Sequence, residues 1–288
     1  MEVCITNYGA RVVSIMVPDR NGKMEDVVNG FPTINEYMNI NQNFGSTVGR
    51  YIGRILNATF TLDSITYQLE SNTGVHSAHG GPSGFATRIW QAEQLEPSAV
   101  KLNYLSVDGE GGFPGNLSVS MIYRLTDNNE LDITYEAKTD KPTVVNLSHH
   151  SFFNISGDLT TTIESDILYV NGDYITEYDS TKCVTGKLMP VAGTPFDFTA
   201  PRRIGERIDE DHPQIVFTRG GYDHCWVLNT HGDVSQLAAS VYDEKSGRLL
   251  EVYTNGPGLQ VYTAGGLKGK MIGKQGIAYP KRNSVCLE

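Results

Sequence analysis

Hydrophobic and polar residues alternate with a period of two along much of this chain. Residues 117–139, LSVSMIYRLTDNNELDITYEAKT, contain two alternating runs separated by the Asp-Asn-Asn segment 127–129. Successive side chains of a strand point to opposite faces of a sheet, and Asp and Asn are common in tight turns. The segment therefore predicts a β-hairpin.

Three further segments show the same pattern. Residues 58–69, ATFTLDSITYQL, hold two short alternating runs around an Asp-Ser pair. Residues 248–265, RLLEVYTNGPGLQVYTAG, repeat the scheme, with a break at 255–258. Residues 1–19, MEVCITNYGARVVSIMVPD, are typical of a strand, a turn and a second strand. Clusters of Gly, Asp, Asn and Pro separate the predicted strands throughout.

Helical patterns are short and rare in this sequence. Segments 34–45 and 203–212 each favour a short helical turn, and no amphipathic run reaches twelve residues. Strands and helices do not alternate, which argues against a parallel α/β fold, and no repeat of fixed period is present. We therefore expect an all-β fold, a large sandwich or a barrel, forming a single domain over residues 1–288.

The charge of the chain is acidic and dispersed. The sequence has 23 Lys and Arg against 33 Asp and Glu, a formal net charge of −10. The basic residues form no cluster beyond short pairs such as Arg202-Arg203. Proteins that bind nucleic acid usually carry a basic patch, so we expect no nucleic-acid partner.

The four cysteines, Cys4, Cys183, Cys225 and Cys286, are widely spaced and form no CxxC pair. This spacing is not that of a zinc site, and we expect reduced thiols, with a disulfide in an oxidising compartment left open.

No apolar run approaches the roughly 20 residues of a membrane span, so we expect no membrane partner. We expect a cytoplasmic location. Both ends look trimmed, which leaves a periplasmic or secreted location open.

Two adjacent histidines, His149 and His150, follow an apolar run in VVNLSHHSFFNISG, residues 144–157. Adjacent residues of a strand face opposite ways, so we expect one histidine to line a site and the other to pack or meet solvent. His149 and His150 could form a metal site with His76 and His79. Because the two adjacent side chains face opposite ways, such a site is disfavoured, and we predict no metal.

Three other polar segments carry candidate chemistry. Residues 46–57 are rich in Gly and Arg but lack a GKS or GKT ending, so Arg54 is a better partner for sugar hydroxyls than for phosphate. His79 precedes two glycines, which allow close approach of a ligand; a turn with a surface histidine is the simpler alternative. Asp223 opens an apolar strand beside aromatics, which suits either hydroxyl recognition or a turn cap.

Taken together, these segments resemble the aldose 1-epimerase (galactose mutarotase) family over essentially the whole chain. Seven motifs occur in the family's order: GRYIGRI, SAHGG, VNLSHHSFFN, TPFDF, GGYDHCWVLN, GPGLQVYT and CLE. The resemblance implies an antiparallel β-supersandwich with a sugar cleft on its concave face. It also implies that family members begin earlier and continue beyond CLE, so we expect this chain to be trimmed at both ends.

The resemblance implies roles for six residues. Glu288 of CLE matches the catalytic base, and His150, not His149, matches the catalytic acid. Four residues match positions that hold sugar hydroxyls: Arg54, His79, Asp223 and Gln260. The chain departs from the family at Gly53 and His149, where many members have Asn, and at Phe152, where many have Tyr. These departures affect sugar preference and spare the proposed acid and base.

Mutarotation needs one group to take the C1 hydroxyl proton and another to protonate the ring oxygen, so the resemblance implies no cofactor. We expect a protonated His150 as the acid, because the pKa of histidine lies near working pH. The expected substrate is a free aldohexose such as glucose or galactose, and the expected assembly is a monomer or a homodimer.

Three rival functions stay open from the sequence. A glycoside hydrolase would use Asp223 and Glu288 as its carboxylate pair across a glycosidic bond. A non-catalytic carbohydrate-binding domain would keep Asp223 and the aromatics without needing His150. A phosphosugar epimerase would require more cationic groups than Arg54.

Overall fold

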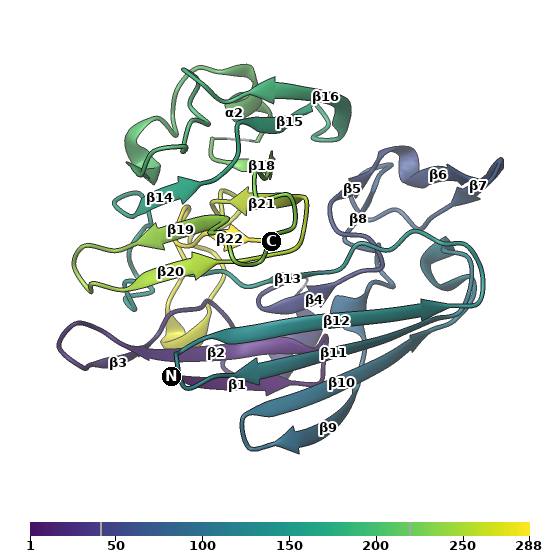
Figure 1. The fold of residues 1–288 in the computed structure, drawn as a ribbon, viewed down its shortest axis with the longest axis horizontal. Coiled ribbons are helices and arrows are strands. Elements are labelled where there is room, and N and C mark those ends of the chain that lie inside the picture. The colour runs from purple at the N-terminus through teal and green to yellow at the C-terminus, as the bar shows by residue number, and fades with distance from the viewer. Residues whose placement is uncertain (41, 219) are drawn as a thin grey trace. The chain divides into compact units, whose positions relative to one another are not determined.

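The computed structural model describes residues 1–40, 42–218 and 220–288 and confirms the all-β prediction. These residues form 22 strands and two short α-helices (Figure 1). The chain divides into two compact units. The first unit comprises residues 1, 3–13 and 42–150, and the second comprises the described residues of 2, 14–41 and 151–288. Whether they behave as the expected single domain stays a prediction.

The first unit consists of short and long antiparallel strands. Its strands are β1 (Glu2–Thr6), β4 (Ser46–Val48), β5 (Arg54–Ile55), β6 (Thr59–Leu62), β7 (Ile65–Gln68), β8 (Ser77–Ala78), β9 (Gln91–Glu96), β10 (Ala99–Ser106), β11 (Leu117–Leu125), β12 (Leu131–Thr139) and β13 (Ser148–His150). Three single-turn 3-10 helices connect them: η1 (Leu56–Ala58), η2 (Phe85–Thr87) and η3 (Glu110–Gly112). β2 (Arg11–Pro18) begins in the first unit and continues into the second.

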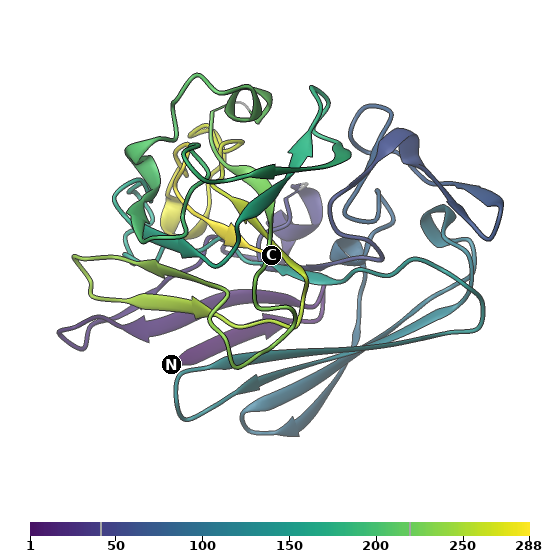
Figure 2. The ribbon, with the colours of Figure 1, turned by 45° about the horizontal axis from the view of Figure 1, so that its top comes forward.

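The largest sheet of the first unit has four strands in the order β12-β11-β10-β9, which lie side by side in Figures 1 and 2. The predicted hairpin at 117–139 forms its β11–β12 pair, with Leu117 opposite Thr139 and Leu125 opposite Leu131. Asn129 adopts a positive φ of 60° in the turn, a conformation that Asn tolerates better than most residues. The alternation predicted for β11 is present, because residues at odd positions such as Val119 and Met121 are buried.

The two short alternating runs predicted at 58–69 form strands β6 and β7. β6 and β7 pair antiparallel, with Leu62 opposite Ile65. Asp63 and Ser64 both have positive φ, 49° and 64°, which is the geometry of a two-residue type I′ turn.

The second unit contains the remaining strands and both α-helices. Its strands are β3 (Met24–Asp26), β14 (Ile167–Val170), β15 (Tyr174–Tyr178), β16 (Val184–Pro190), β17 (Arg202–Arg203), β18 (Asp223–Val227), β19 (Ala239–Tyr242), β20 (Leu249–Val252), β21 (Gly258–Tyr262) and β22 (Cys286–Leu287). Its helices are α1 (Ile34–Asn39), α2 (Pro213–Phe217), η4 (Ile204–Glu206) and η5 (Lys274–Gly276). α1 and η4 lie in the two segments for which the sequence favours short helical turns.

Two sheets form the centre of the second unit, with orders β17-β14-β19-β20 and β16-β15-β18-β21-β22. Their buried residues share one hydrophobic core, in which Trp226 of β18 and Val241 of β19 are fully buried. Burying such large apolar side chains stabilises a fold by about 1.5–3 kcal/mol each. The core thereby fixes β18 and β21, which carry Asp223 and Gln260, and β22, which directly precedes Glu288.

The segment 248–265 differs from its prediction. It contains two strands separated at the expected break, but β20 and β21 do not pair with each other. β20 pairs with β19, and β21 lies between β18 and β22 in the other sheet. The Asn-Gly-Pro-Gly break therefore carries the chain from one sheet to the other. Among the described residues, none of the helices has the length and apolar character required to cross a membrane.

Candidate active site

β13 orients the two adjacent histidines in opposite directions. It pairs antiparallel with β4, so that His149 lies opposite Thr47 and His150 opposite Ser46. The backbone oxygen of His150 accepts a hydrogen bond from the Gly45 amide at 2.9 Å. His150 ends the strand, and only 5% of its surface is exposed.

His149 has a structural environment, as predicted. Its Nδ1 lies 3.1 Å from the hydroxyl oxygen of the buried Tyr123, and the two rings meet edge to face at a centroid distance of 5.8 Å. Burial lowers the pKa of His149 to about 4. The half-buried residue therefore packs against Tyr123 and is neutral at physiological pH.

His79 follows β8 in a backbone conformation that its neighbours dictate. Its φ is 54°, and its amide donates a hydrogen bond to the Gly53 oxygen at 3.0 Å. The next residue, Gly80, has a φ of 88°, and a Cβ built there would lie 1.8 Å from the oxygen of Gly49. The sequence-based expectation of positive φ or close approach at this glycine is thus confirmed, although the close approach is to backbone.

The two arginines of the Gly-rich segment have different environments. Arg50 is 2% exposed, and its guanidinium donates hydrogen bonds to backbone oxygens that include those of Pro114 and Gly115, at 2.8 Å each. Its donors are committed to organising loops, which leaves it unsuited to phosphate. Arg54 lies on β5 opposite Ala78, and Ala78 is the residue that precedes His79.

Arg54, His79 and His150 form what we call the first-unit group. The ring centroids of His79 and His150 lie 5.4 Å apart. Burial, with the positive charge of Arg54, lowers the pKa of His79 to about 4. Burial, with the neighbouring His79 and His149, holds the pKa of His150 well below its ordinary value. This differs from the expectation of a pKa near working pH, because the sequence does not reveal how completely the ring is enclosed.

Asp223, Gln260 and Glu288 form what we call the second-unit group. β18 begins at Asp223 and pairs with β21, which carries Gln260. The Gln260 side chain donates a hydrogen bond from Nε2 to Oδ1 of Asp223 at 2.9 Å. Glu288 directly follows β22, and its amide donates to the Gln260 oxygen at 2.9 Å. Three consecutive strands of one sheet therefore bring these polar side chains together.

Two residues that the sequence reasoning missed contact this group. The Tyr178 hydroxyl donates to Oε1 of Gln260 at 3.2 Å, and Nζ of Lys182 lies 3.5 Å from Oδ2 of Asp223. Both come from the β15–β16 hairpin, about forty residues or more before their partners in the sequence. Only the pairing of β15 with β18 brings them near, so no local motif signals them.

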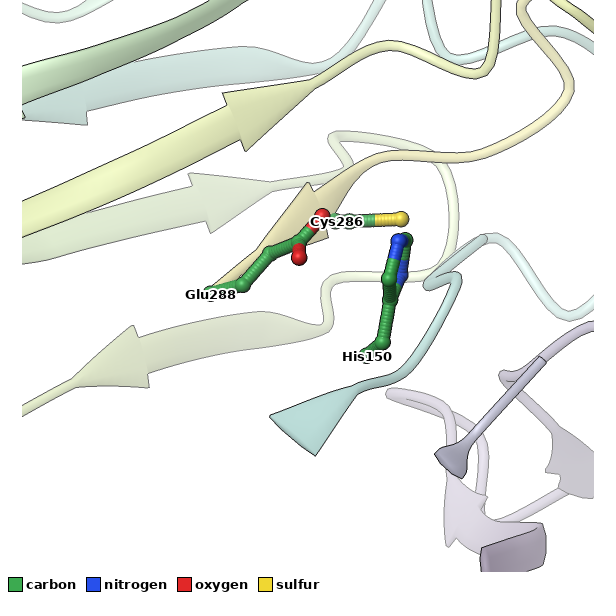
Figure 3. A group of neighbouring side chains, drawn as sticks. All are labelled: His150, Cys286 and Glu288. Atoms are coloured by element: carbon green, nitrogen blue, oxygen red, sulfur yellow. The ribbon is translucent and has the colours of Figure 1, made fainter. Parts of the chain in front are cut away.

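Glu288 has an electrostatic effect on two thiols. Burial and the Glu288 carboxylate raise the pKa of Cys225 to about 11. Burial and the same carboxylate raise the pKa of Cys286 well above its ordinary value. Cys286 and Glu288 are two residues apart on an extended strand, and their side chains leave it on the same side (Figure 3). Both thiols are therefore protonated and unreactive at neutral pH.

The histidine beside Asp223 is structural. His224 is fully buried, stacks on Tyr178 at a centroid distance of 4.8 Å, and has its Nε2 3.2 Å from Oε1 of Gln214. Burial lowers its pKa to about 3. His76 is likewise engaged, since its Nδ1 accepts a hydrogen bond from the Asn57 amide at 3.0 Å. The prediction of no metal site stays a prediction.

The chemistry of these two groups is that of proton transfer and hydroxyl recognition. The first-unit group supplies neutral imidazoles and a guanidinium, and the second-unit group supplies two carboxyl side chains and a carboxamide. Such groups bind and orient a neutral polyol by hydrogen bonds and exchange protons with it. They need no redox-active group for an acid–base reaction.

Comparison with known proteins agrees with this chemistry. The family model for aldose 1-epimerase matches residues 1–288. Galactose mutarotase from Sus scrofa is 38% identical over 288 residues, which cover all of this chain and 82% of the relative. Galactose mutarotase from Homo sapiens is 36% identical with the same coverage. Aldose 1-epimerase from Escherichia coli K12 is 35% identical over 271 residues, 93% of this chain and 77% of the relative.

Solved structures give the same result for the fold. An aldose epimerase homologue from C. elegans matches with a TM-score of 0.89 at 28% identity, covering 99% of this chain and 84% of that one. Galactose 1-epimerase from Lactobacillus acidophilus matches with a TM-score of 0.86 at 28% identity, covering 99% and 80%. The protein is thus an isomerase-class enzyme with a galactose mutarotase-like all-β sandwich fold. Specifically, the chain belongs to the aldose 1-epimerase family.

Proposed function

We propose that this aldose 1-epimerase interconverts the α and β anomers of a free aldohexose, galactose or glucose. The relatives named galactose mutarotase support this choice of sugar. The observation that carries the proposal is the second-unit group. Gln260 is hydrogen bonded through its side chain to Asp223 and through its backbone to Glu288, so the two carboxyl residues are held on either side of β21.

We assign Glu288 as the base and His150 as the acid of one turnover. Glu288 takes the proton of the C1 hydroxyl, the C1–O5 bond breaks, and O5 takes a proton from His150. The open aldehyde rotates about the C1–C2 bond. On reclosure, Glu288 returns its proton to O1 and His150 regains its own from O5, so both groups are restored without a cofactor.

The low pKa of His150 determines the form in which it acts. Because burial disfavours the imidazolium, the resting ring is neutral, and we propose that its N–H is the donor to O5. A neutral imidazole is a weak acid. It is matched to the strongly basic alkoxide that develops on O5 as the ring opens.

The hydroxyl-binding roles fall to residues of both groups. We propose that Arg54 and His79 donate hydrogen bonds to sugar oxygens, and that Asp223 and Gln260 accept and donate to neighbouring hydroxyls. Nζ of Lys182 lies 3.5 Å from Oδ2 of Asp223, so the lysine contacts the carboxyl group that we assign to hydroxyl binding. The two carboxyl oxygens of Asp223 accept hydrogen bonds from two hydroxyls of one sugar, which fixes the ring for proton transfer.

We further propose that the two units act together as one functional domain, as a monomer or a homodimer, without nucleic-acid or membrane partners. We also propose a cytoplasmic location, with which the four unpaired cysteines are compatible.

Polarimetry of freshly dissolved α-D-galactose and α-D-glucose tests the proposed function. A catalytic amount of the protein should speed the approach to an unchanged final rotation for at least one of the two sugars. Acceleration with neither sugar would overturn the proposal, and saturable sugar binding without acceleration would then support a carbohydrate-binding domain.

A further inference from the structure

The solvent-facing side of the β9–β12 sheet carries an ordered set of polar side chains. The strand register aligns four of them in one row across the sheet. In this row Gln91 lies opposite Asn103, Asn103 opposite Ser120, and Ser120 opposite Glu136. Because directly opposed residues on one face lie about 4.5–5.5 Å apart, the row is a continuous strip of hydrogen-bonding groups.

A second row lies two residues further along the same face. Leu105 is opposite Ser118, and Ser118 is opposite Lys138. Leu105 is 53% exposed, and Ile89, just before β9, is 70% exposed. The two rows line a hollow of about 520 Å³, within the range of small-molecule sites. Figures 1 and 2 show the four strands that form its floor.

The polar side chains of the hollow are not used by the protein itself. Among the described residues, no side-chain hydrogen bond or ion pair within the protein is made by these six: Gln91, Asn103, Ser118, Ser120, Glu136 and Lys138. Elsewhere in the same unit, a comparable side chain is paired, since Nδ2 of Asn116 donates a hydrogen bond to Oδ2 of Asp140 at 2.7 Å. The row is therefore available for an external partner.

The side chains that line the hollow indicate which class of ligand it would bind. Two carboxamides both donate and accept, the Glu136 carboxylate accepts, and the Lys138 ammonium donates, so the charges in the hollow sum to zero. A phosphate or nucleic-acid ligand would require an excess of cations. The aromatic hydroxyl at the rim, on Tyr104, already bonds to Glu110 at 2.6 Å. A neutral molecule rich in hydroxyls, with C–H faces for Leu105 and Ile89, fits this lining best.

We propose that this hollow is a second carbohydrate-binding site, which takes a neutral oligosaccharide. The first row crosses four strands, about 14 Å at roughly 4.8 Å per strand, which is longer than one pyranose ring. None of the lining residues belongs to the first-unit or second-unit group. This function is separate from epimerisation. The linked sugar rings bound in the hollow have no free anomeric centre, so they cannot be substrates of the reaction. It would hold the enzyme near a source of free aldose.

Isothermal titration of the full chain with a panel of malto-, cello-, xylo- and β-galacto-oligosaccharides at millimolar concentration tests the proposal. At least one member should bind, and binding should persist in the presence of saturating galactose and in Glu288→Gln. The double variant Asn103→Ala with Glu136→Ala should weaken binding at least about tenfold. Lys138→Ala should weaken it independently.

Thr134→Ala is the matched control, because Thr134 is exposed on β12 but lies outside the hollow. It should bind the oligosaccharide as the wild type does, and thermal unfolding should show that all variants are folded. Three results would overturn the proposal: no binding by any panel member, competition by galactose, or unchanged affinity in both hollow variants. Concentration-dependent self-association that is lost in the hollow variants would instead assign the face to a second copy of the chain.

Discussion

At the scale of single residues, the state of the His150 ring decides how the proposed acid works. Burial and the nearby His79 and His149 rings hold its pKa well below the ordinary 6.5. A required imidazolium would become scarcer about tenfold with each pH unit above that pKa. A neutral N–H donor has no such dependence.

The proposed neutral donor therefore predicts that kcat/KM for galactose is nearly constant between about pH 6.5 and 8. Initial mutarotation rates corrected for the uncatalysed reaction at each pH measure this directly. A decline of about tenfold per pH unit across this range would show that protonated His150 is required instead.

Asp166 offers a second prediction at this scale. It directly precedes the Ile167–Tyr242 pair of β14 and β19, and Asp243 directly follows it on the other strand. Both carboxyl groups are buried, and Oδ2 of Asp166 has no hydrogen-bond partner among the described residues. Burial, and secondly the charge of Asp243, raises the pKa of Asp166 to about 8.

A raised carboxyl pKa means that the folded state holds a proton that the unfolded state releases above about pH 4. The stability that this group contributes is full below pH 4 and is lost as pH rises through about 8. Asp166→Asn should therefore raise the free energy of unfolding at pH 8 by about 1–3 kcal/mol, measured by urea denaturation. Asp132→Asn, at an exposed position of β12, is the control and should change little. Destabilisation by Asp166→Asn at pH 8 would refute the interpretation.

At the scale of elements, two glycines near the site have positive φ for different reasons. Gly53 has a φ of 80° with open space where a Cβ would lie, whereas a Cβ on Gly80 would lie 1.8 Å from the Gly49 oxygen. Gly53 therefore needs only backbone freedom, which Asn also tolerates better than most residues.

Gly53→Ala should cost about 1–2 kcal/mol of unfolding free energy, because alanine is strained in a left-handed conformation. Gly80→Ala should cost a further 1–3 kcal/mol or so, because the added methyl group displaces backbone, and it should also slow mutarotation by moving His79. Urea denaturation and polarimetry of the two variants give the comparison. Equal effects of the two substitutions would contradict the steric argument.

Local elements were predictable where their signals were local. The hairpin at 117–139 and the strands of 58–69 follow from alternation and turn residues. The roles of the six candidate residues come from the family resemblance and stay predictions. The pairing of β20 and β21 with other strands was not predictable, because partner choice depends on contacts distant in sequence. Tyr178 was missed for the same reason, and the low pKa of His150 reflects burial that no motif encodes.

At the scale of the whole molecule, buried neutral histidines make the fold sensitive to acid. Burial lowers the pKa to about 4 for His79 and His149 and to about 3 for His224. In the unfolded chain each of these histidines binds a proton near pH 6.5, whereas in the folded protein it binds a proton only at a lower pH. Stability therefore falls as pH drops from about 6.5 to 4, by up to about 1.4 kcal/mol per pH unit for each group.

Urea denaturation at pH 7 and pH 5 should show this loss of stability. Asp166, whose pKa is raised, contributes an opposite change over this pH range, but it is one group against three histidines. His149→Asn removes one of the titrating histidines and should make the pH dependence shallower, while lowering stability at pH 7 by about 1 kcal/mol through the lost contact with Tyr123. An unchanged pH dependence in this variant would show that His149 is not buried as a neutral ring.

Glu288 and His150, the proposed base and acid, are the two residues on which the mutarotation mechanism depends most directly. The decisive measurement is the initial rate of galactose mutarotation by Glu288→Gln and His150→Asn, with Glu251→Gln and His231→Asn as controls at exposed positions. Each of the first two should lose at least about a hundredfold in kcat while keeping the wild-type unfolding transition, and the controls should retain full activity. Rates within a few-fold of the wild type in either Glu288→Gln or His150→Asn would contradict the assignment of that residue.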